Sequence, residues 1–195
     1  MKRLLTAALA LGLFLPAFTQ RSSIRTQIEK TETLHEGKLV KARVLRVTST
    51  IPMPVDSGWR NVQSPALLQF VAKGMISFKP DSVSLPHRWE QGETYGVRMW
   101  ILGLLPFGGV HYLFIEKIDA STYRLSTREW DRSVSVWNHD VSLTPLPAGG
   151  FEYTDEILIY AGWKTAGVTA FAKRFYKHRQ KRWQIVASQN LRFGE

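Results

Sequence analysis

The most regular pattern of apolar and polar positions in this chain runs from Gly162 to Ser188. The segment contains no proline, and its apolar residues recur at the spacing of one helix face while its basic residues gather on the opposite face. The apolar face holds Val168, Ala172, Phe175, Trp183 and Val186, and the basic face holds Lys173, Arg174, Lys177, His178 and Lys181. The pattern therefore predicts one long amphipathic helix.

Arg179 is out of place in this pattern, because it projects from the apolar face of the predicted helix. A guanidinium on a buried face needs a partner, since removing one partner of a buried ion pair costs roughly 3–5 kcal/mol. We therefore expect either a carboxylate from elsewhere in the chain or a bound anion beside Arg179.

The pattern before this helix is mainly that of strands. Residues 42–50 alternate and are rich in β-branched side chains, which predicts a strand. Two short helices are expected next, at 56–63 and at 65–73, with Ser64 as the N-cap of the second. Five further strands are predicted at 94–104, 110–118, 122–130, 133–144 and 151–161. The turns between them are short, which favours an antiparallel meander.

This order of elements predicts an α+β domain in which a curved antiparallel sheet buries one face against the long C-terminal helix. Together with the segments WNHDVSLTPLPAGGFEYTDEILIYAG (137–162) and FYKHRQKRW (175–183), it resembles the helix-grip fold of the Bet v 1, START and polyketide-cyclase superfamily, SRPBCC, in a bacterial branch. The resemblance covers residues 41–187. It implies two short helices after the first strand, a sheet wrapped around the long helix, and an apolar cavity for lipids, sterols, polyketides or hormones.

The N-terminal residues have the composition of a secretory signal peptide. Two basic residues precede an apolar stretch at 4–14, which is shorter than the roughly 20 residues that a membrane span needs. We predict a signal peptide at 1–19 and hence export to the periplasm or secretion; an uncleaved anchor is the second alternative, and a misassigned start codon with a cytoplasmic protein is the third. Residues 20–40 are polar without a clear period, so they are expected to be a linker before a ligand-binding domain at 41–190.

Composition narrows the chemistry further. The 195-residue chain has no cysteine, which excludes disulfides, thiolate nucleophiles and thiolate metal sites. Its five histidines lack the spacing of a metal motif, so neither a metal nor another cofactor is predicted. The formal net charge is +10, and six cations within the predicted helix form either a solvated face or a surface for an anionic membrane. The predicted signal peptide argues against nucleic acid as a partner.

Strand parity selects the side chains that face the predicted helix. On the last three predicted strands, one face of each carries Glu129, Trp137, His139, Tyr153 and Asp155. The two carboxylates and the imidazole of this set are therefore expected to meet Arg179 in the interior. In a structural interpretation these groups form one internal network that joins helix to sheet. In a functional interpretation they orient the polar head of a ligand, or act as acid and base.

Large aromatic residues are candidate walls of the cavity, although such residues also fill ordinary cores. The predicted ligand-binding residues are Trp100, Tyr112, Trp137, His139, Tyr153, Phe175, Tyr176 and Arg179, with Phe114 and Trp163 as further candidate walls. Phe107 precedes Gly108 and Gly109, which predicts an apolar hairpin tip that could act as a gate.

Three functions are compatible with these residues. The first is a carrier or sensor of a hydrophobic small molecule, with Arg179 at an anionic end of that ligand. The second is an enzyme similar to polyketide cyclases and dehydratases, in which His139 acts as acid or base and Glu129 or Asp155 tunes it. The third is a protein whose basic helix face binds an anionic membrane. The resemblance favours the first.

Overall fold

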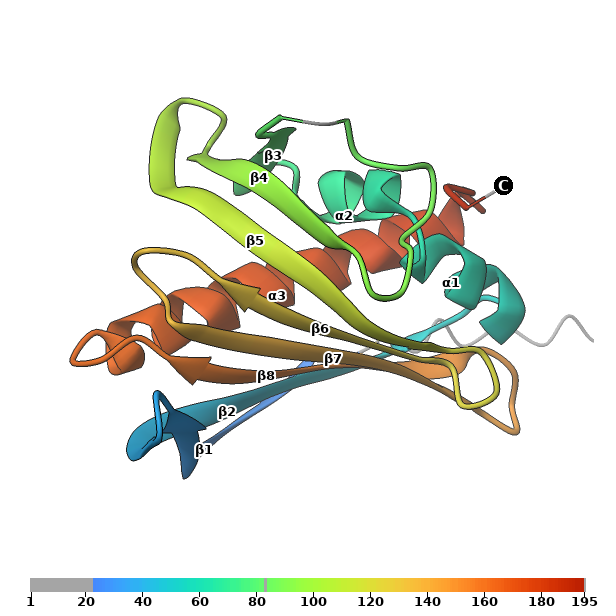
Figure 1. Ribbon diagram of the computed structural model, residues 1–195. Coiled ribbons are helices and arrows are strands. Elements are labelled where there is room, and N and C mark those ends of the chain that lie inside the picture. Colours follow the sequence, from blue (N-terminus) through green and yellow to red (C-terminus); the bar gives the residue numbers. More distant parts are fainter. Residues whose placement is uncertain (1–22, 83, 195) are drawn as a thin grey trace, which may run out of the picture.

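The structure is a computed structural model that describes residues 23–82 and 84–194. Within them, one curved antiparallel sheet wraps around a long C-terminal helix, which confirms the predicted α+β helix-grip fold (Figure 1). The elements are β1 (Arg25–His35), β2 (Lys38–Ile51), α1 (Val55–Val62), α2 (Pro65–Ala72), β3 (Ile76–Pro80), β4 (Thr94–Ile101), β5 (Leu105–Asp119), β6 (Arg124–Trp130), β7 (Val136–Pro145), β8 (Phe151–Tyr160) and α3 (Thr165–Ser188). The predicted signal peptide at 1–19 lies outside the described residues.

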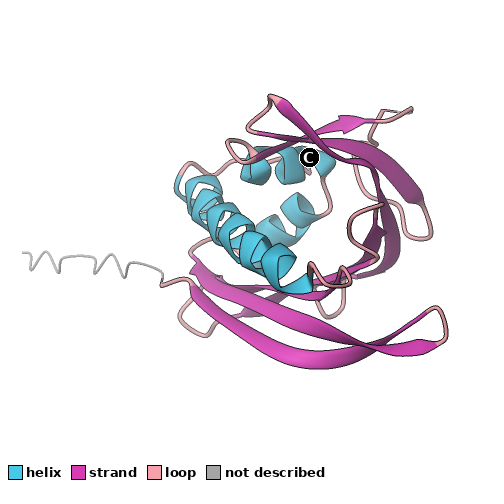
Figure 2. Ribbon diagram, turned by 90° about the vertical axis from the view of Figure 1, so that its left-hand side faces the viewer, coloured by secondary structure: helices cyan, strands magenta, loops and turns pink. Residues whose placement is uncertain are grey.

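Most neighbouring strands of the sheet are also neighbours in sequence. The strand order is β1-β2-β8-β7-β6-β5-β4-β3, and every adjacent pair is antiparallel. One long connection separates β2 from β8, its neighbour in the sheet. The sheet curls so that its concave side surrounds α3, with α1 and α2 on the same side (Figure 2). A helix enclosed in this way can meet side chains from most of the strands.

α3 is buried through the face that the sequence predicts. Its buried apolar residues include Ala172, Phe175, Trp183 and Val186. The helix begins at Thr165 rather than at Gly162, because Gly162 has a left-handed φ of +57°. The Thr165 hydroxyl accepts a hydrogen bond from the Ala161 N–H and donates to the Gly162 carbonyl, which fixes the start of the helix. No helix in the described ranges is long and apolar enough to cross a membrane.

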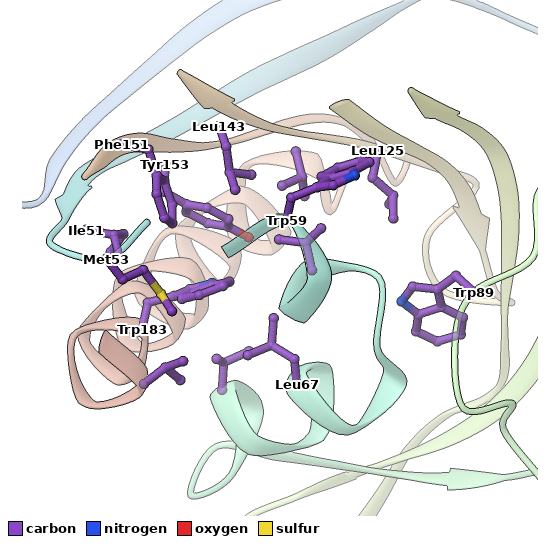
Figure 3. Packing of buried hydrophobic residues seen from close by; sticks show 14 of the residues in the cluster. Ile51, Met53, Trp59, Leu67, Trp89, Leu125, Leu143, Phe151, Tyr153 and Trp183 are labelled. Carbon is purple, nitrogen blue, oxygen red and sulfur yellow. The ribbon is translucent and has the colours of Figure 1, made fainter. Parts of the chain in front are cut away.

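Trp183 belongs to the larger of two buried apolar clusters, between α3 and the sheet (Figure 3). Its ring lies 5.1 Å from that of Tyr153 and 6.2 Å from that of Phe151, measured between centroids. Side chains from β2, α1, α2, β5, β6, β7 and the connecting loops complete the cluster, among them Ile51, Met53, Trp59, Leu67, Leu125 and Leu143. Burying one large apolar side chain contributes about 1.5–3 kcal/mol, so this cluster anchors the C-terminal half of α3.

Residues 20–40 are not the linker that their composition suggested. Most of them form β1 and the start of β2, which are joined by a two-residue turn at Glu36 and Gly37. Both residues have a positive φ, 50° and 72°, as a type I′ turn requires. β1 is an edge strand with exposed side chains on both faces, so it shows no apolar alternation. The folded domain therefore begins near Arg25 rather than at Lys41.

The predicted turn between the strands at 94–104 and 110–118 is also misplaced. The chain turns at residues 102–104, and β5 continues through Gly108 and Gly109 as a bulge in its pairing with β4. Phe107 therefore lies on β5 rather than at a hairpin tip. The short edge strand β3 escapes the sequence pattern because Ile76 is its one buried residue.

Two helical glycines test this packing in opposite directions. A Cβ at Gly58 of α1 would lie 2.5 Å from the ring of Phe151, which is itself fully buried, so Gly58→Ala should lower the free energy of unfolding by about 1–3 kcal/mol. A Cβ at Gly167 of α3 would meet nothing within 4 Å, so Gly167→Ala should raise it by about 0.5–1 kcal/mol. Urea titrations of both variants measure the difference, and equal effects would contradict the close contact of α1 with β8.

Candidate functional site

A cavity of about 400 Å³ lies between the concave face of the sheet and α3. Its walls are mostly apolar and come from the helices and from β3 to β8, including Phe78, Met99, Leu113, Leu125, Val141 and Phe171. The exposed residues Phe107, Lys164 and Gly167 also line it. The mouth of the cavity therefore lies between the β4–β5 hairpin and the start of α3.

Six titratable side chains gather beside this cavity and are termed the polar cluster. They are His111, Glu129, Asp131, His139, Asp155 and Arg179. Five come from β5 to β8 or the residue after β6, where side chains of the same parity on adjacent strands point to one side, and the sixth comes from α3. The structure thus brings together the four predicted residues Glu129, His139, Asp155 and Arg179. All members line the cavity except Asp155, which is fully buried beneath His139.

His139 and Asp155 form a buried ion pair. His139 Nε2 donates to Asp155 Oδ1 over 2.9 Å, and the second oxygen of Asp155 accepts from Gln180 Nε2 over 3.1 Å. Burial opposes ionisation of Asp155, but Arg179 and His139 outweigh it and hold the pKa of this carboxyl below its usual range. Burial likewise opposes the charge on His139, but its hydrogen bond with Asp155 and the nearby carboxylate of Glu129 raise its pKa.

His111 lies between two carboxylates. Its Nε2 is 2.9 Å from Glu129 Oε2 and its Nδ1 is 3.1 Å from Asp131 Oδ2, so only the imidazolium can donate to both. Burial lowers the pKa of His111, but the hydrogen bonds with Asp131 and Glu129 exceed that effect and raise the pKa to about 9. Glu129 also accepts from Thr127 Oγ1 over 2.6 Å, and its pKa lies well below the usual range because of its two histidine partners.

Arg179 is the member of the cluster whose hydrogen bonding is incomplete. Its Nη2 is 3.9 Å from Asp155 Oδ1, too far for a hydrogen bond, and its buried Nε has no partner among the described residues. The guanidinium lies 4.8 Å from the ring centroid of Tyr176 and 5.8 Å from that of Phe175. The positive charge of Arg179 is therefore stabilised by one carboxylate and two aromatic rings. Its guanidinium keeps unused hydrogen-bond donors beside the cavity.

The charges of the polar cluster balance. Three carboxylates, on Glu129, Asp131 and Asp155, face two imidazolium groups and one guanidinium. Such a cluster needs no counter-ion, but Arg179 can still receive a polar head group and His139 can still donate a proton. In residues 23–82 and 84–194, no group of three His, Asp or Glu side chains could hold a metal ion.

The remaining predicted wall residues divide into two groups. Trp137, Tyr153, Phe175 and Tyr176 line the cavity. Trp137 Nε1 donates to the Tyr176 hydroxyl over 3.2 Å, and the Tyr153 hydroxyl donates to Asp155 over 3.2 Å. Burial raises the pKa of both tyrosines far above the usual value, so both phenols stay protonated and able to donate. These four aromatic side chains join the apolar walls to the polar cluster.

Tyr112 and Phe114 do not line the cavity, contrary to the prediction. They alternate along β5 with the inward-facing His111, so they lie on the outer face of the sheet. Tyr112 is 39% exposed there and stacks on Trp130. Both faces of β5 are apolar in sequence, so parity alone could not tell which one turns inward.

Trp100 and Trp163 are also outside the cavity. Trp100 alternates with Met99, which lines the cavity, and its ring instead carries the ammonium of Lys79 at 4.4 Å from the centroid. Trp163 precedes α3 and is 92% exposed. Phe107, predicted as a gate at a hairpin tip, lines the mouth from β5.

Three buried polar residues beside the site were not predicted. Gln180 of α3 donates to the Val47 carbonyl over 2.6 Å and to Asp155, and its position four residues after Tyr176 is a helical-face signal that could have identified it. His111 and Asp131 become neighbours only through the pairing of β5 with β6. No spacing within either strand indicates that contact.

No family model and no curated protein matches this sequence. Several solved structures match the fold at low identity. Protein Ms6760 from Mycobacterium smegmatis is 15% identical with a TM-score of 0.55, covering 73% of this chain and 89% of that chain. Protein NE0264 from Nitrosomonas europaea is 16% identical with a TM-score of 0.57, covering 75% and 95%. CalU16 from Micromonospora echinospora is 13% identical with a TM-score of 0.54, covering 87% and 76%. These likenesses support the fold alone.

Protonation of His111 links the stability of the fold to pH. The pKa of His111 is about 9 in the folded protein against 6.5 for an ordinary histidine, so the folded state binds the proton more tightly. Its contribution to the free energy of unfolding is therefore complete below about pH 6.5 and is lost as the pH rises through about 9. The difference corresponds to on the order of 3 kcal/mol.

We predict that the free energy of unfolding of the wild-type protein falls between about pH 6.5 and about pH 9, and that His111→Gln makes this fall smaller. Urea titrations at both pH values measure the effect. Exposed His87→Gln is the control and should keep the wild-type slope. Nitrogen-15 NMR of the wild-type imidazole reads the same protonation without a substitution. Equal slopes for the wild type and His111→Gln, with a neutral His111 ring at pH 7.5, would contradict the assignment.

Proposed function

We propose that the protein binds a hydrophobic small molecule, of lipid, sterol or polyketide type, in the cavity between the sheet and α3. The observation that carries this proposal is the cavity of about 400 Å³ with mostly apolar walls. Sites for small molecules have volumes of about 300–1,000 Å³, whereas ordinary cores leave few voids larger than a water molecule. Side chains that line an empty apolar space lose van der Waals contacts, and a bound apolar ligand of matching size would restore them.

We further propose that the chain belongs to the SRPBCC superfamily. The helix-grip fold and the segments at 137–162 and 175–183 support this membership. The superfamily resemblance implies an apolar ligand between the concave sheet and the C-terminal helix, and the cavity of this chain has the same position. The proposal of a bound hydrophobic molecule therefore rests on the cavity first and on the resemblance second.

The polar end of such a ligand has one natural partner. The Nε of Arg179 is buried beside the cavity without a hydrogen bond, and the other charges of the polar cluster are already paired. A carboxylate, or another oxygen with negative charge, would accept from this guanidinium in a site where water competes little. The ligand would then lie with its polar end at Arg179 and its apolar part along the walls.

A fluorescent fatty acid and the matching fatty alcohol test this orientation. We predict that Arg179→Met weakens binding of the acid roughly ten- to hundredfold, the loss of a charge-assisted hydrogen bond, and weakens binding of the alcohol much less. The change in fluorescence on titration gives both affinities. Lys173→Met, on the basic face of α3, is the control and should bind both probes as the wild type does. Equal losses for acid and alcohol would contradict a head-group contact at Arg179, and wild-type protein that binds neither probe would contradict the cavity proposal.

A second candidate function is that of an enzyme similar to polyketide cyclases and dehydratases, and the position of His139 favours it. His139 lines the cavity, donates to Asp155 and lies 3.8 Å from Glu129 Oε1. Its raised pKa keeps the ring protonated, so it could act as a general acid toward a bound carbonyl compound. Asp155 and Glu129 would hold the ring in place and tune its proton affinity.

Turnover of polyketide-like carbonyl compounds separates the two candidates. For the enzyme, we predict that His139→Gln lowers the rate roughly 100-fold or more, the usual contribution of a positioned acid or base, whereas Lys173→Met does not. Chromatographic analysis of the products measures the rate. Unchanged turnover in His139→Gln, with the fatty acid still bound, would remove His139 from any catalytic role and leave the binding function standing.

A further inference from the structure

Several turns come together at the end of the molecule that holds the mouth of the cavity. The β1–β2 turn, the β4–β5 turn and the start of α3 lie at the same end in Figure 1, and Figure 2 views that end directly. Most of the large apolar side chains that the described residues expose lie on or beside these turns. They are termed the apolar tips, and they are Leu34, Leu39, Leu102, Leu104, Leu105, Phe107 and Trp163.

The β4–β5 turn exposes leucines where folding alone favours polar residues. Leu102 is 66% exposed and has a left-handed φ of 52°, followed by Gly103 at 71°. This region is unfavourable for leucine, and asparagine there would both relieve the strain and remove apolar surface from water. The β1–β2 turn has nearly the same φ angles and places the polar Glu36 where this turn has Leu102. Neither backbone geometry nor solubility explains Leu102, whereas a partner that covers it does.

Trp163, on the other side of the mouth, is another large apolar side chain that is exposed to solvent. Its side chain is 92% exposed, although indole rings usually account for much of the area that a protein buries. Phe107 connects the two sides, because it is exposed at the surface and also lines the cavity. Phe107 therefore joins the apolar tips to the wall of the cavity.

Cations accompany the apolar tips. Lys38 follows the β1–β2 turn, Arg132 lies in the β6–β7 turn and Lys164 precedes α3, and all three are exposed. The Asp131 side chain is buried against His111, so the exposed carboxylate of these turns is that of Glu36. This combination of apolar side chains and positive charge matches an anionic lipid surface, where tryptophan and leucine enter the interface and cations meet the head groups.

We propose that this end of the protein docks on an anionic lipid bilayer, with the apolar tips in the interfacial layer and the mouth of the cavity facing the membrane. The tips come from three separate segments of the chain. A bilayer accepts such separate insertions without shape complementarity, whereas a protein partner needs a matching surface. The docking does not depend on what the cavity holds, but it would place an apolar cavity next to a store of hydrophobic molecules.

This surface is distinct from the basic face of α3. Lys173, Lys177 and Lys181 lie along α3 outside its buried face, so binding through them would turn the side of the helix rather than the mouth toward the membrane. That face would bind through charge alone and would release fully at high salt, whereas the apolar tips would retain part of their binding. The two orientations are therefore separable by experiment.

A dye on a single cysteine tests which end meets the lipid, because the chain has no cysteine of its own. In the full chain, a bimane on Leu104→Cys should shift to the blue with vesicles of phosphatidylcholine and phosphatidylglycerol, and shift less with phosphatidylcholine alone. A bimane on Ser121→Cys is the matched control, since the β5–β6 turn lies at the opposite end, and it should keep its aqueous spectrum. A shift at Ser121→Cys without one at Leu104→Cys would overturn the proposal.

Vesicle sedimentation of the full chain measures the contribution of the tips. Leu102→Ser with Leu104→Ser, and separately Trp163→Ser, should each lower partitioning onto the anionic vesicles by roughly tenfold or more. Lys173→Glu with Lys177→Glu should change it much less, and the reverse order would assign binding to α3 and overturn the proposal. A blue shift at Leu104→Cys without vesicles, together with a dimer in analytical ultracentrifugation that the serine pair abolishes, would show that a second copy covers the tips and would also overturn it.

Discussion

The arrangement of helix and sheet depends on one fully buried carboxylate, Asp155. It accepts hydrogen bonds from His139 on β7, Tyr153 on β8 and Gln180 on α3, and it lies 3.9 Å from Arg179. Loss of one partner from a buried ion pair costs roughly 3–5 kcal/mol, so these side chains must keep their positions together. Directional contacts of this kind fix one register of α3 on the sheet, which apolar packing alone specifies less sharply.

Arg179 and Gln180, the α3 residues beside Asp155, lie between two parts of the helix that have different surroundings. On the C-terminal side, Trp183 and Val186 are fully buried in the cluster that they form with the sheet and the two short helices. On the N-terminal side, Val168 and Phe171 line the cavity. Ala172 and Phe175 of the same part pack against Leu45 and Val47 of β2 and Ile157 and Ile159 of β8, so this part of the helix is held by the sheet on one side and borders the cavity on the other.

The sequence could predict which side chains face the interior wherever one face of a helix or strand is clearly apolar. Arg179 could be placed by the helical period and His139 by strand parity, and the structure brings both to Asp155. Tyr112 could not be placed, because both faces of β5 are apolar and the size of a ring does not say which face is inside. His111 needed the register of β5 against β6, which is a contact between distant residues that no local spacing encodes. Edge strands such as β1 lack the one-sided burial on which the method relies.

Because the charges inside the polar cluster balance, long-range attraction and close contact with a ligand involve different groups of the protein. Each of its three positive charges lies within 3.9 Å of a carboxylate oxygen, so their fields largely cancel outside, and the net charge of +10 acts from the surface. At distances up to the screening length of about 8–10 Å, a molecule or membrane meets the surface cations first. Inside, the guanidinium of Arg179, which lines the cavity, is the contact that we propose for a polar group. An amphiphile bound as we propose, with its polar end at Arg179, would have its apolar part along the walls toward Phe107, which is exposed at the surface and lines the cavity.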